Sequence, residues 1–310
     1  MLGRVYAIAI NTFREAVRDR ILYAVLAFGL ALLVFTLALA ELSLDQQRRI
    51  VVDIGLALIS LFAVVIAVFL GSSLLYKEID RKTLYVILPK PIARHEFLVG
   101  KYFGIAITAI VFIALMGSVE LWVVAIQAGA PLWLAAAGPL VLGAGLGVAL
   151  WKARDRTAVL VPWSLVALAG AAGLAQTAHV DLGPLLAAMT LTVGEVLILA
   201  AVAIFFSSFS TPFMTGAFTL GVWLVGRSAD EMIDMRSRTL APSVRSALRA
   251  VAEIAPNFHL FVPGRHTLES RAGDLGGPFS YVASSMGYAV LYAAVVLTLA
   301  ALIFRRRDFL

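Results

Sequence analysis

The chain has 310 residues, of which 61% are hydrophobic and 14% are charged, and its formal net charge is +6. Soluble domains carry roughly 25% charged residues, so the composition excludes an ordinary soluble protein and indicates a polytopic membrane protein. The chain has no cysteine, which excludes disulfides and cysteine metal sites. Because the basic residues lie beside apolar runs, the positive charge indicates membrane topology and not binding of nucleic acid.

Residues 1–20 are predicted to form an amphipathic helix in the cytoplasmic membrane interface. Read as a helix, this segment places Leu2 and Phe13 on one side and Arg4, Arg14 and Arg18 on the other. We do not expect a cleavable signal peptide, because arginines are spread through the segment and a full span follows at once.

Eight apolar runs follow, and we predict that each crosses the membrane. They cover residues 21–40, 51–76, 102–127, 131–151, 157–178, 185–206, 214–226 and 281–304. Most of them reach the roughly 20 residues that a helix needs to cross the hydrocarbon, whereas the run 214–226 depends on its polar neighbours.

The runs 131–151 and 157–178 are predicted to form an inserted hairpin. Lys152, Arg154 and Arg156 lie between them and place their turn in the cytoplasm. Small residues such as Gly138, Gly143, Gly145 and Gly147 offer faces for close helix packing in lipid. A re-entrant pair of segments is the alternative.

The loop at 77–101 holds six of the 25 basic residues and lies between two spans. Pro89 and Pro91 break any continuous helix in it. Before the break, Leu84 and Leu88 fall on one helical face, so a small amphipathic helix is predicted there. Such a helix suits docking on another protein, but the positive-inside rule alone could also account for the basic residues.

Ten residues of this loop follow an ordered pattern. They are Glu78, Arg81, Thr83, Leu84, Leu88, Pro91, Ile92, Arg94, Phe97 and Lys101. The pattern resembles the coupling loop of type-2 ABC transporter permeases, which sits on the ATPase subunit. The polar turn 207–213 and the Pro256, Asn257 and Phe261 pattern also resemble that family. The resemblance implies that the residues coupling the chain to an ATPase are Glu78, Arg81, Lys82, Leu84, Leu88, Pro91, Arg94, Phe97 and Lys101.

The resemblance also implies a fold and a set of partners. We expect an all-α polytopic membrane protein with a six-span type-2 ABC permease core, an inserted transmembrane hairpin (about eight spans) and an N-terminal interfacial elbow helix. A generic amphipathic anchor is the alternative for that helix. The expected partners are an ABC ATPase subunit, which would bind ATP and Mg²⁺, and a second permease copy or a sister permease. This chain is expected to bind no cofactor. We expect export across a bacterial inner membrane, with both termini cytoplasmic.

Two acidic residues lie deep in predicted spans, where a charge is costly unless it faces a bundle interior or a cavity. Glu120 is a candidate for the translocation path or a subunit contact, and snorkelling toward the outer surface is its alternative. Glu195 lies near the middle of its span. It is a candidate for a structural hydrogen-bond node or a group that lines the path.

No catalytic motif is visible in the sequence. It contains no G-x-x-x-x-G-K-[ST] loop for phosphates, so we expect no ATPase site in this chain. His259 and His266 lack a third ligand at suitable spacing, and a zinc site is therefore not expected. Residues 227–281 form a long polar stretch that is predicted to lie outside, with an amphipathic helix near 244–254. The competing functions are a gradient-driven secondary transporter, which should show internal repeats, and a structural scaffold.

Overall fold

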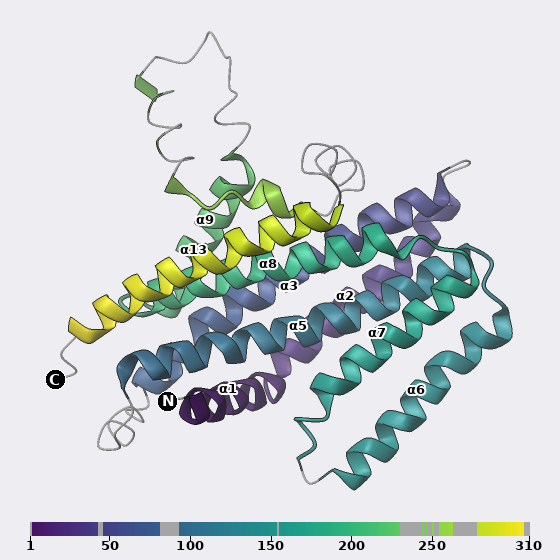
Figure 1. Ribbon diagram of the computed structural model, residues 1–310, viewed down its shortest axis with the longest axis horizontal. Coiled ribbons are helices and arrows are strands. Elements are labelled where there is room, and N and C mark those ends of the chain that lie inside the picture. Colours follow the sequence, from purple (N-terminus) through teal and green to yellow (C-terminus); the bar gives the residue numbers. More distant parts are fainter. Residues whose placement is uncertain are drawn as a thin grey trace.

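The computed structural model describes residues 2–42, 46–80, 93–153, 155–229, 254–262 and 278–306, together with positions 243, 244, 246 and 250. Within these ranges all regular structure is helical (Figure 1). The helices are α1 (Leu2–Val17), α2 (Arg20–Glu41), α3 (Gln47–Asp80), α5 (Arg94–Gln127), α6 (Leu132–Lys152), α7 (Leu160–Thr177), α8 (Leu182–Ser207), α9 (Pro212–Arg227), the 3-10 helix η1 (Phe258–Phe261) and α13 (Pro278–Arg306).

Seven of the described helices are long and apolar enough to cross a membrane: α2, α3, α5, α6, α7, α8 and α13. This confirms the predicted all-α polytopic membrane fold. Helix α9 corresponds to the short run 214–226 and has 16 residues, below the roughly 20 needed for a straight crossing. It packs against α8 and α3 inside the same bundle.

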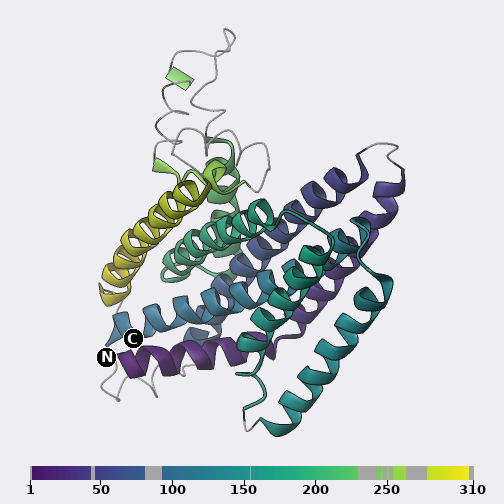
Figure 2. The same ribbon diagram turned by 45° about the vertical axis from the view of Figure 1, so that its right-hand side comes forward.

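The centre of the bundle is formed by α3, α5 and α8, and the outer helices cover it. Within its span, 72% of α8 is buried, compared with 6% of α6. Figures 1 and 2 show α6 at the edge of the molecule, where it lies beside α7 and also contacts α5 through a hydrogen bond from Trp122 Nε1 to the Ala135 carbonyl at 2.9 Å. Helix α7 packs on α5, and α13 packs on α8. The hairpin of α6 and α7 is therefore an addition to the side of the bundle.

One end of the bundle, which we call the inner end, gathers several helix termini. The start of α1, the end of α3, the start of α5 and the end of α13 all lie there in both views (Figures 1 and 2). Helix α1 packs along the inner half of α5 with a buried face made of Ala9, Thr12, Phe13, Ala16 and Val17. The opposite end carries the connection between α2 and α3.

The helices beside the predicted coupling loop are longer than the apolar runs. Helix α3 continues to Asp80, and α5 already begins at Arg94. A helix can continue past its apolar run, because its backbone hydrogen bonds do not depend on apolar side chains. At the start of α5, the Glu96 carboxylate caps the helix by accepting a hydrogen bond from the Ala93 N–H at 3.3 Å. Residues 81–92, with both prolines and the predicted docking helix, lie outside the described residues, as does most of the predicted helix near 244–254.

Candidate functional site

The start of α5 faces α1, and two residues of the predicted coupling set lie in that interface. Phe97 is 5% exposed and Lys101 is 2% exposed. The Lys101 ammonium lies 3.6 Å from the Glu15 carboxylate of α1 and 5.7 Å from the centre of the Phe97 ring. Lys101 therefore contacts α1 within the chain, and the side chains of Phe97 and Lys101 do not form an outer surface.

Two glycines let α1 and α5 approach closely at the same place. A Cβ atom added at Gly100 would lie 2.6 Å from the Cβ of Ile8, and one added at Gly104 would overlap Thr12. Such distances are too short for carbon atoms, so neither position can hold a larger side chain without a shift of the helices. Together with the ion pair between Arg4 and Glu96 at 3.6 Å, this contact, which we call the α1–α5 seam, joins the two helices into one unit.

The other coupling candidates lie within the segment 81–92, which is outside the described residues, or directly beside it. Glu78 is in the last turn of α3, and Arg94 is the first residue of α5. Arg81, Lys82, Leu84, Leu88 and Pro91 lie outside the described residues. Their contact with an ATPase stays a prediction.

Glu195 lies at the centre of a buried hydrogen-bond network. Its side chain is fully buried on α8. Ser60 Oγ of α3 donates to Glu195 Oε2 at 2.9 Å, and Trp223 Nε1 and Arg227 of α9 donate to Oε1 at 2.7 and 3.0 Å. The Arg227 guanidinium also lies over the Trp223 ring at 5.6 Å from its centre. A buried carboxylate is tolerated when it is paired and hydrogen-bonded in this way.

This geometry places Glu195 at a hydrogen-bond node that ties α3, α8 and α9 together. The sequence alone indicates Glu195 as a candidate node but does not identify its partners. Arg227 at the end of the short run 214–226 was the available signal, because it follows Trp223 by one helical turn. A part for Glu195 in transport stays a prediction.

Glu120 lies in a different environment on α5. It is fully buried, and neither carboxylate oxygen has a hydrogen-bond partner among the described residues. Gly55 of α3 provides the space for it, because a Cβ atom at that position would overlap the carboxylate. The snorkelling alternative is therefore wrong, since the side chain lies between α3 and α5 and not at the surface. Whether Glu120 belongs to a translocation path stays a prediction.

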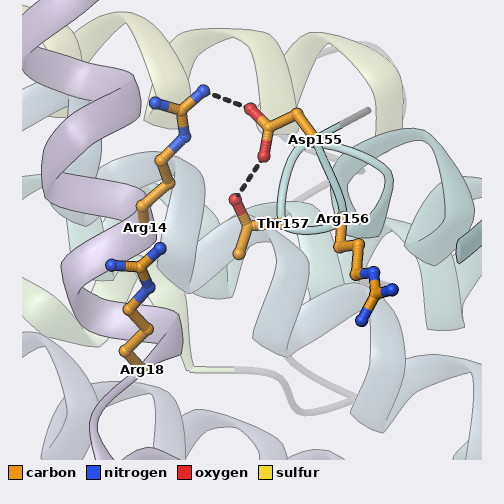
Figure 3. Close-up of a pocket in the computed structure, with 5 residues that line it drawn as sticks. All are labelled: Arg14, Arg18, Asp155, Arg156 and Thr157. Atoms are coloured by element: carbon orange, nitrogen blue, oxygen red, sulfur yellow. Dashed lines mark hydrogen bonds and ion pairs between the residues drawn. The ribbon is translucent and has the colours of Figure 1, made fainter. Parts of the chain in front are cut away.

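The turn between α6 and α7 contacts α1 through polar side chains. Arg14 of α1 donates to Asp155 Oδ2, and Thr157 Oγ1 donates to Asp155 Oδ1 at 2.9 Å (Figure 3). The hydrogen bond from Arg14, followed by that from Thr157, lowers the pKa of the Asp155 carboxyl below its ordinary value. This turn and α1 line a hollow of about 620 Å³ that is open to solvent at the inner end of the bundle.

The short helix η1, which precedes α13, packs against α8 and α9. Phe258 and Phe261 are fully buried, and Tyr281 donates a hydrogen bond from its hydroxyl to the Leu260 carbonyl at 2.6 Å. The Asn257 side chain accepts the His259 N–H at 3.0 Å. His266 lies outside the described residues, and in the part of the chain that the structure describes no three His, Asp or Glu residues are grouped as metal ligands.

The whole chain was compared with known proteins and protein families. No curated protein is significantly similar to the chain. Residues 6–309 match the model of a family described as "ABC-2 family transporter protein". Because this match covers nearly the whole chain, the protein belongs to the ABC-2 family of transporter membrane proteins.

Proposed function

We propose that this chain is the permease subunit of an ABC exporter and that a separate ATPase subunit supplies the energy. Membership of the ABC-2 family supports a permease role. The observation that carries the coupling proposal is the α1–α5 seam. Helix α5 runs without interruption from Arg94 at the inner end to Gln127 at the other end. A force applied beside its first turn would therefore reach the far side of the membrane.

The proposed coupling uses rigid helices and one external contact. ATP binding to the partner would move the segment 81–92, which joins α3 to α5. Because the glycine contacts and Lys101 fix α1 to α5, the two helices would move as one body. In this mechanism Phe97 and Lys101 position α1, while Arg81, Lys82 and Arg94 contact the ATPase. ATP and Mg²⁺ would bind on the partner subunit, and this chain would bind no cofactor.

The proposed setting is a bacterial inner membrane with the inner end of the bundle in the cytoplasm. The basic residues beside the spans support this orientation, since Lys77, Lys101 and Lys152 all adjoin it. A second copy of this chain, or a sister permease, would complete the transporter, and transport would run outward.

The test is co-purification of the chain with its ATPase after charge reversal at Arg81, Lys82 and Arg94. We expect loss of both ATPase binding and ATP-dependent export. The matched control is reversal of Arg48 and Arg49, at the opposite end of the bundle, which should leave both intact. Retained binding and export in the triple variant, or labelling of the segment 81–92 from outside the cell, would overturn the proposal.

A gradient-driven secondary transporter is the second candidate, and the buried carboxylate of Glu120 favours it. A carboxyl group with no partner among the described residues could exchange a proton during transport. Transport that continues without ATP, collapses with the proton gradient and is lost in Glu120→Gln would support this candidate. If transport in vesicles with the Glu120→Gln variant still requires ATP and does not depend on the proton gradient, a secondary transporter is excluded.

A further inference from the structure

The hollow between α1 and the turn before α7 is lined by an excess of positive charge. Its lining residues are Arg14, Arg18, Asp155, Arg156 and Thr157. Arg14 and Arg18 come from α1 and its end, and the other three come from the turn opposite (Figure 3). Three arginines and a single carboxylate thus line the hollow. A second hollow, lined by Asn11, Arg14, Glu15 and Arg18, adjoins it along α1.

The acidic residues near this hollow are already engaged elsewhere. Asp155 accepts hydrogen bonds from Arg14 and Thr157. Glu15 lies 3.6 Å from the Lys101 ammonium on the side of α5. Among the residues that the structure describes, no carboxylate forms an ion pair with Arg18 or Arg156. The Nε of Arg14 is also buried without a hydrogen-bond acceptor. The hollow therefore offers donors and charge to an anion.

The chemistry of the lining suits a phosphate group. Guanidinium groups present planar N–H donors that match phosphate oxygens. A carboxylate ligand would need only one such fork, whereas a phosphate can receive donors from two sides of the hollow.

The surroundings indicate where the phosphate comes from. Phe13 and Val17 of α1 pack with Val111 of α5, and Leu160 and Val161 of α7 pack against them. This apolar cluster places the hollow where the chain passes from polar side chains to membrane-spanning helix. Trp151, at the end of α6, is 81% exposed, as is typical of aromatic residues at the level of lipid headgroups.

We propose that Arg14, Arg18 and Arg156 form a binding site for the phosphate group of an anionic phospholipid of the inner leaflet. The lipid would bridge α1 and the hairpin turn, beside the link between Arg14 and Asp155. Asp155 holds Arg14 in place and also limits the net charge of the site. Its place in the inner leaflet rests on the proposed orientation of the chain. The site does not depend on the proposed coupling to an ATPase, because none of its residues belongs to the predicted coupling set.

The test is native mass spectrometry of the full chain released from nanodiscs of phosphatidylcholine with added phosphatidylglycerol. The variants are Arg18→Gln, Arg156→Gln and the double variant, with Arg48→Gln as the control that removes the same charge at the opposite end. We expect retention of phosphatidylglycerol to weaken about fivefold for each arginine removed and about 25-fold for both. The control should retain it like the parent chain.

Two further experiments separate loss of the binding site from a folding defect, and a lipid from free phosphate. The Arg18→Lys and Arg156→Lys double variant preserves the charges, so it should retain more phosphatidylglycerol than the double glutamine variant, and the thermal unfolding of both identifies a folding defect. Inorganic phosphate should not displace the lipid. The proposal is overturned if the double glutamine variant folds and retains phosphatidylglycerol like the parent chain. It is overturned as a lipid site if inorganic phosphate binds equally well and displaces the lipid.

Discussion

The inner bundle, which we define as α1, α3, α5, α8 and α9, and the hairpin of α6 and α7 are held by different means. In the inner bundle, buried ion pairs and glycine contacts join neighbouring helices, as at Glu195 and at Gly104. In the hairpin, Gly138, Gly143 and Gly147 have no atom within 4 Å of an added Cβ. The hairpin touches α1 through the half-exposed pair of Arg14 and Asp155. The comparison indicates a tightly packed unit and an outer helix, α6, that is attached more loosely, whereas α7 packs closely along α5.

The largest effect is expected when the buried network of the inner bundle loses its carboxylate. Glu195→Leu leaves Arg227, Trp223 and Ser60 without their acceptor, and we expect the free energy of unfolding to fall by about 3–5 kcal/mol. Unfolding in mixed detergent measures this loss. The double variant Glu195→Leu with Arg227→Met should recover most of it, and a single variant as stable as the parent chain would contradict the network.

Glu195→Gln keeps the shape and separates charge from packing. ATP-dependent export that is unchanged in this variant would remove any part for the charge in transport.

The next largest effect is expected at the α1–α5 seam. Gly104→Val places a side chain against Thr12, and we expect a loss of about 1–3 kcal/mol together with loss of export. The matched variant in the hairpin is Gly147→Val, which should change stability by less than about 0.5 kcal/mol. Thermal unfolding in detergent compares the two, and equal losses would remove the contrast between the regions.

A smaller effect is expected from the ion pair of the seam. Glu15→Gln removes the Glu15 carboxylate from beside the buried ammonium of Lys101, and we expect a loss of about 1–2 kcal/mol. Because Lys101 is 2% exposed, adding salt should recover little of the difference. An effect that disappears in high salt would show that the pair acts like a surface contact.

A still smaller effect on global stability is expected when the ion pair between Arg14 of α1 and Asp155 of the hairpin turn is removed. Asp155→Asn removes the charge that pairs with Arg14, so hydrogen exchange of residues 153–159 should become faster while the unfolding temperature hardly changes. Arg156→Gln is the control, because it alters the same turn without touching this pair. A large fall in the unfolding temperature would show that the hairpin is part of the inner bundle.

The smallest effect is a dependence of this link on pH. The Arg14 guanidinium lowers the pKa of Asp155 in the folded chain. The link is therefore fully present above the ordinary aspartate pKa of about 3.9 and is lost only as the pH falls through the lowered value. Protection of residues 153–159, corrected for intrinsic exchange, should be constant near neutral pH and fall only in strong acid. A fall near neutral pH would contradict this assignment.

The sequence predicted the helices well, because length and apolarity alone determine which segments can cross a membrane. It did less well with the glycines. The small residues of the first hairpin helix predicted close packing at Gly138, Gly143, Gly145 and Gly147, but of these four only Gly145 has a close neighbour, the Trp163 ring. That prediction is wrong within the chain for the other three, since α6 has few partners at all.

Gly100 and Gly104 make the close contact between α5 and α1, and the sequence analysis did not predict it. They lie beside the charged loop, and their four-residue spacing is the small-x-x-x-small pattern of closely packed membrane helices, but this pattern does not identify α1 as the partner. The partners of Glu195 were missed for the same reason. Ser60 and Arg227 are 135 and 32 residues away from it, and only the packing of α3, α8 and α9 brings them together.

The continuous length of α3 and α5 has a consequence for how the two helices lie in the membrane. Each helix has 34 residues, which corresponds to about 50 Å and exceeds the roughly 40–45 Å of a bilayer with its headgroups. Each helix is therefore too long to fit within the bilayer without a tilt, so either the helices are inclined or part of their length lies in water. We expect spin labels at Asp80 and Arg94, the two helix ends that flank the predicted coupling loop, to distinguish these cases by their accessibility to water-soluble and lipid-soluble relaxation agents.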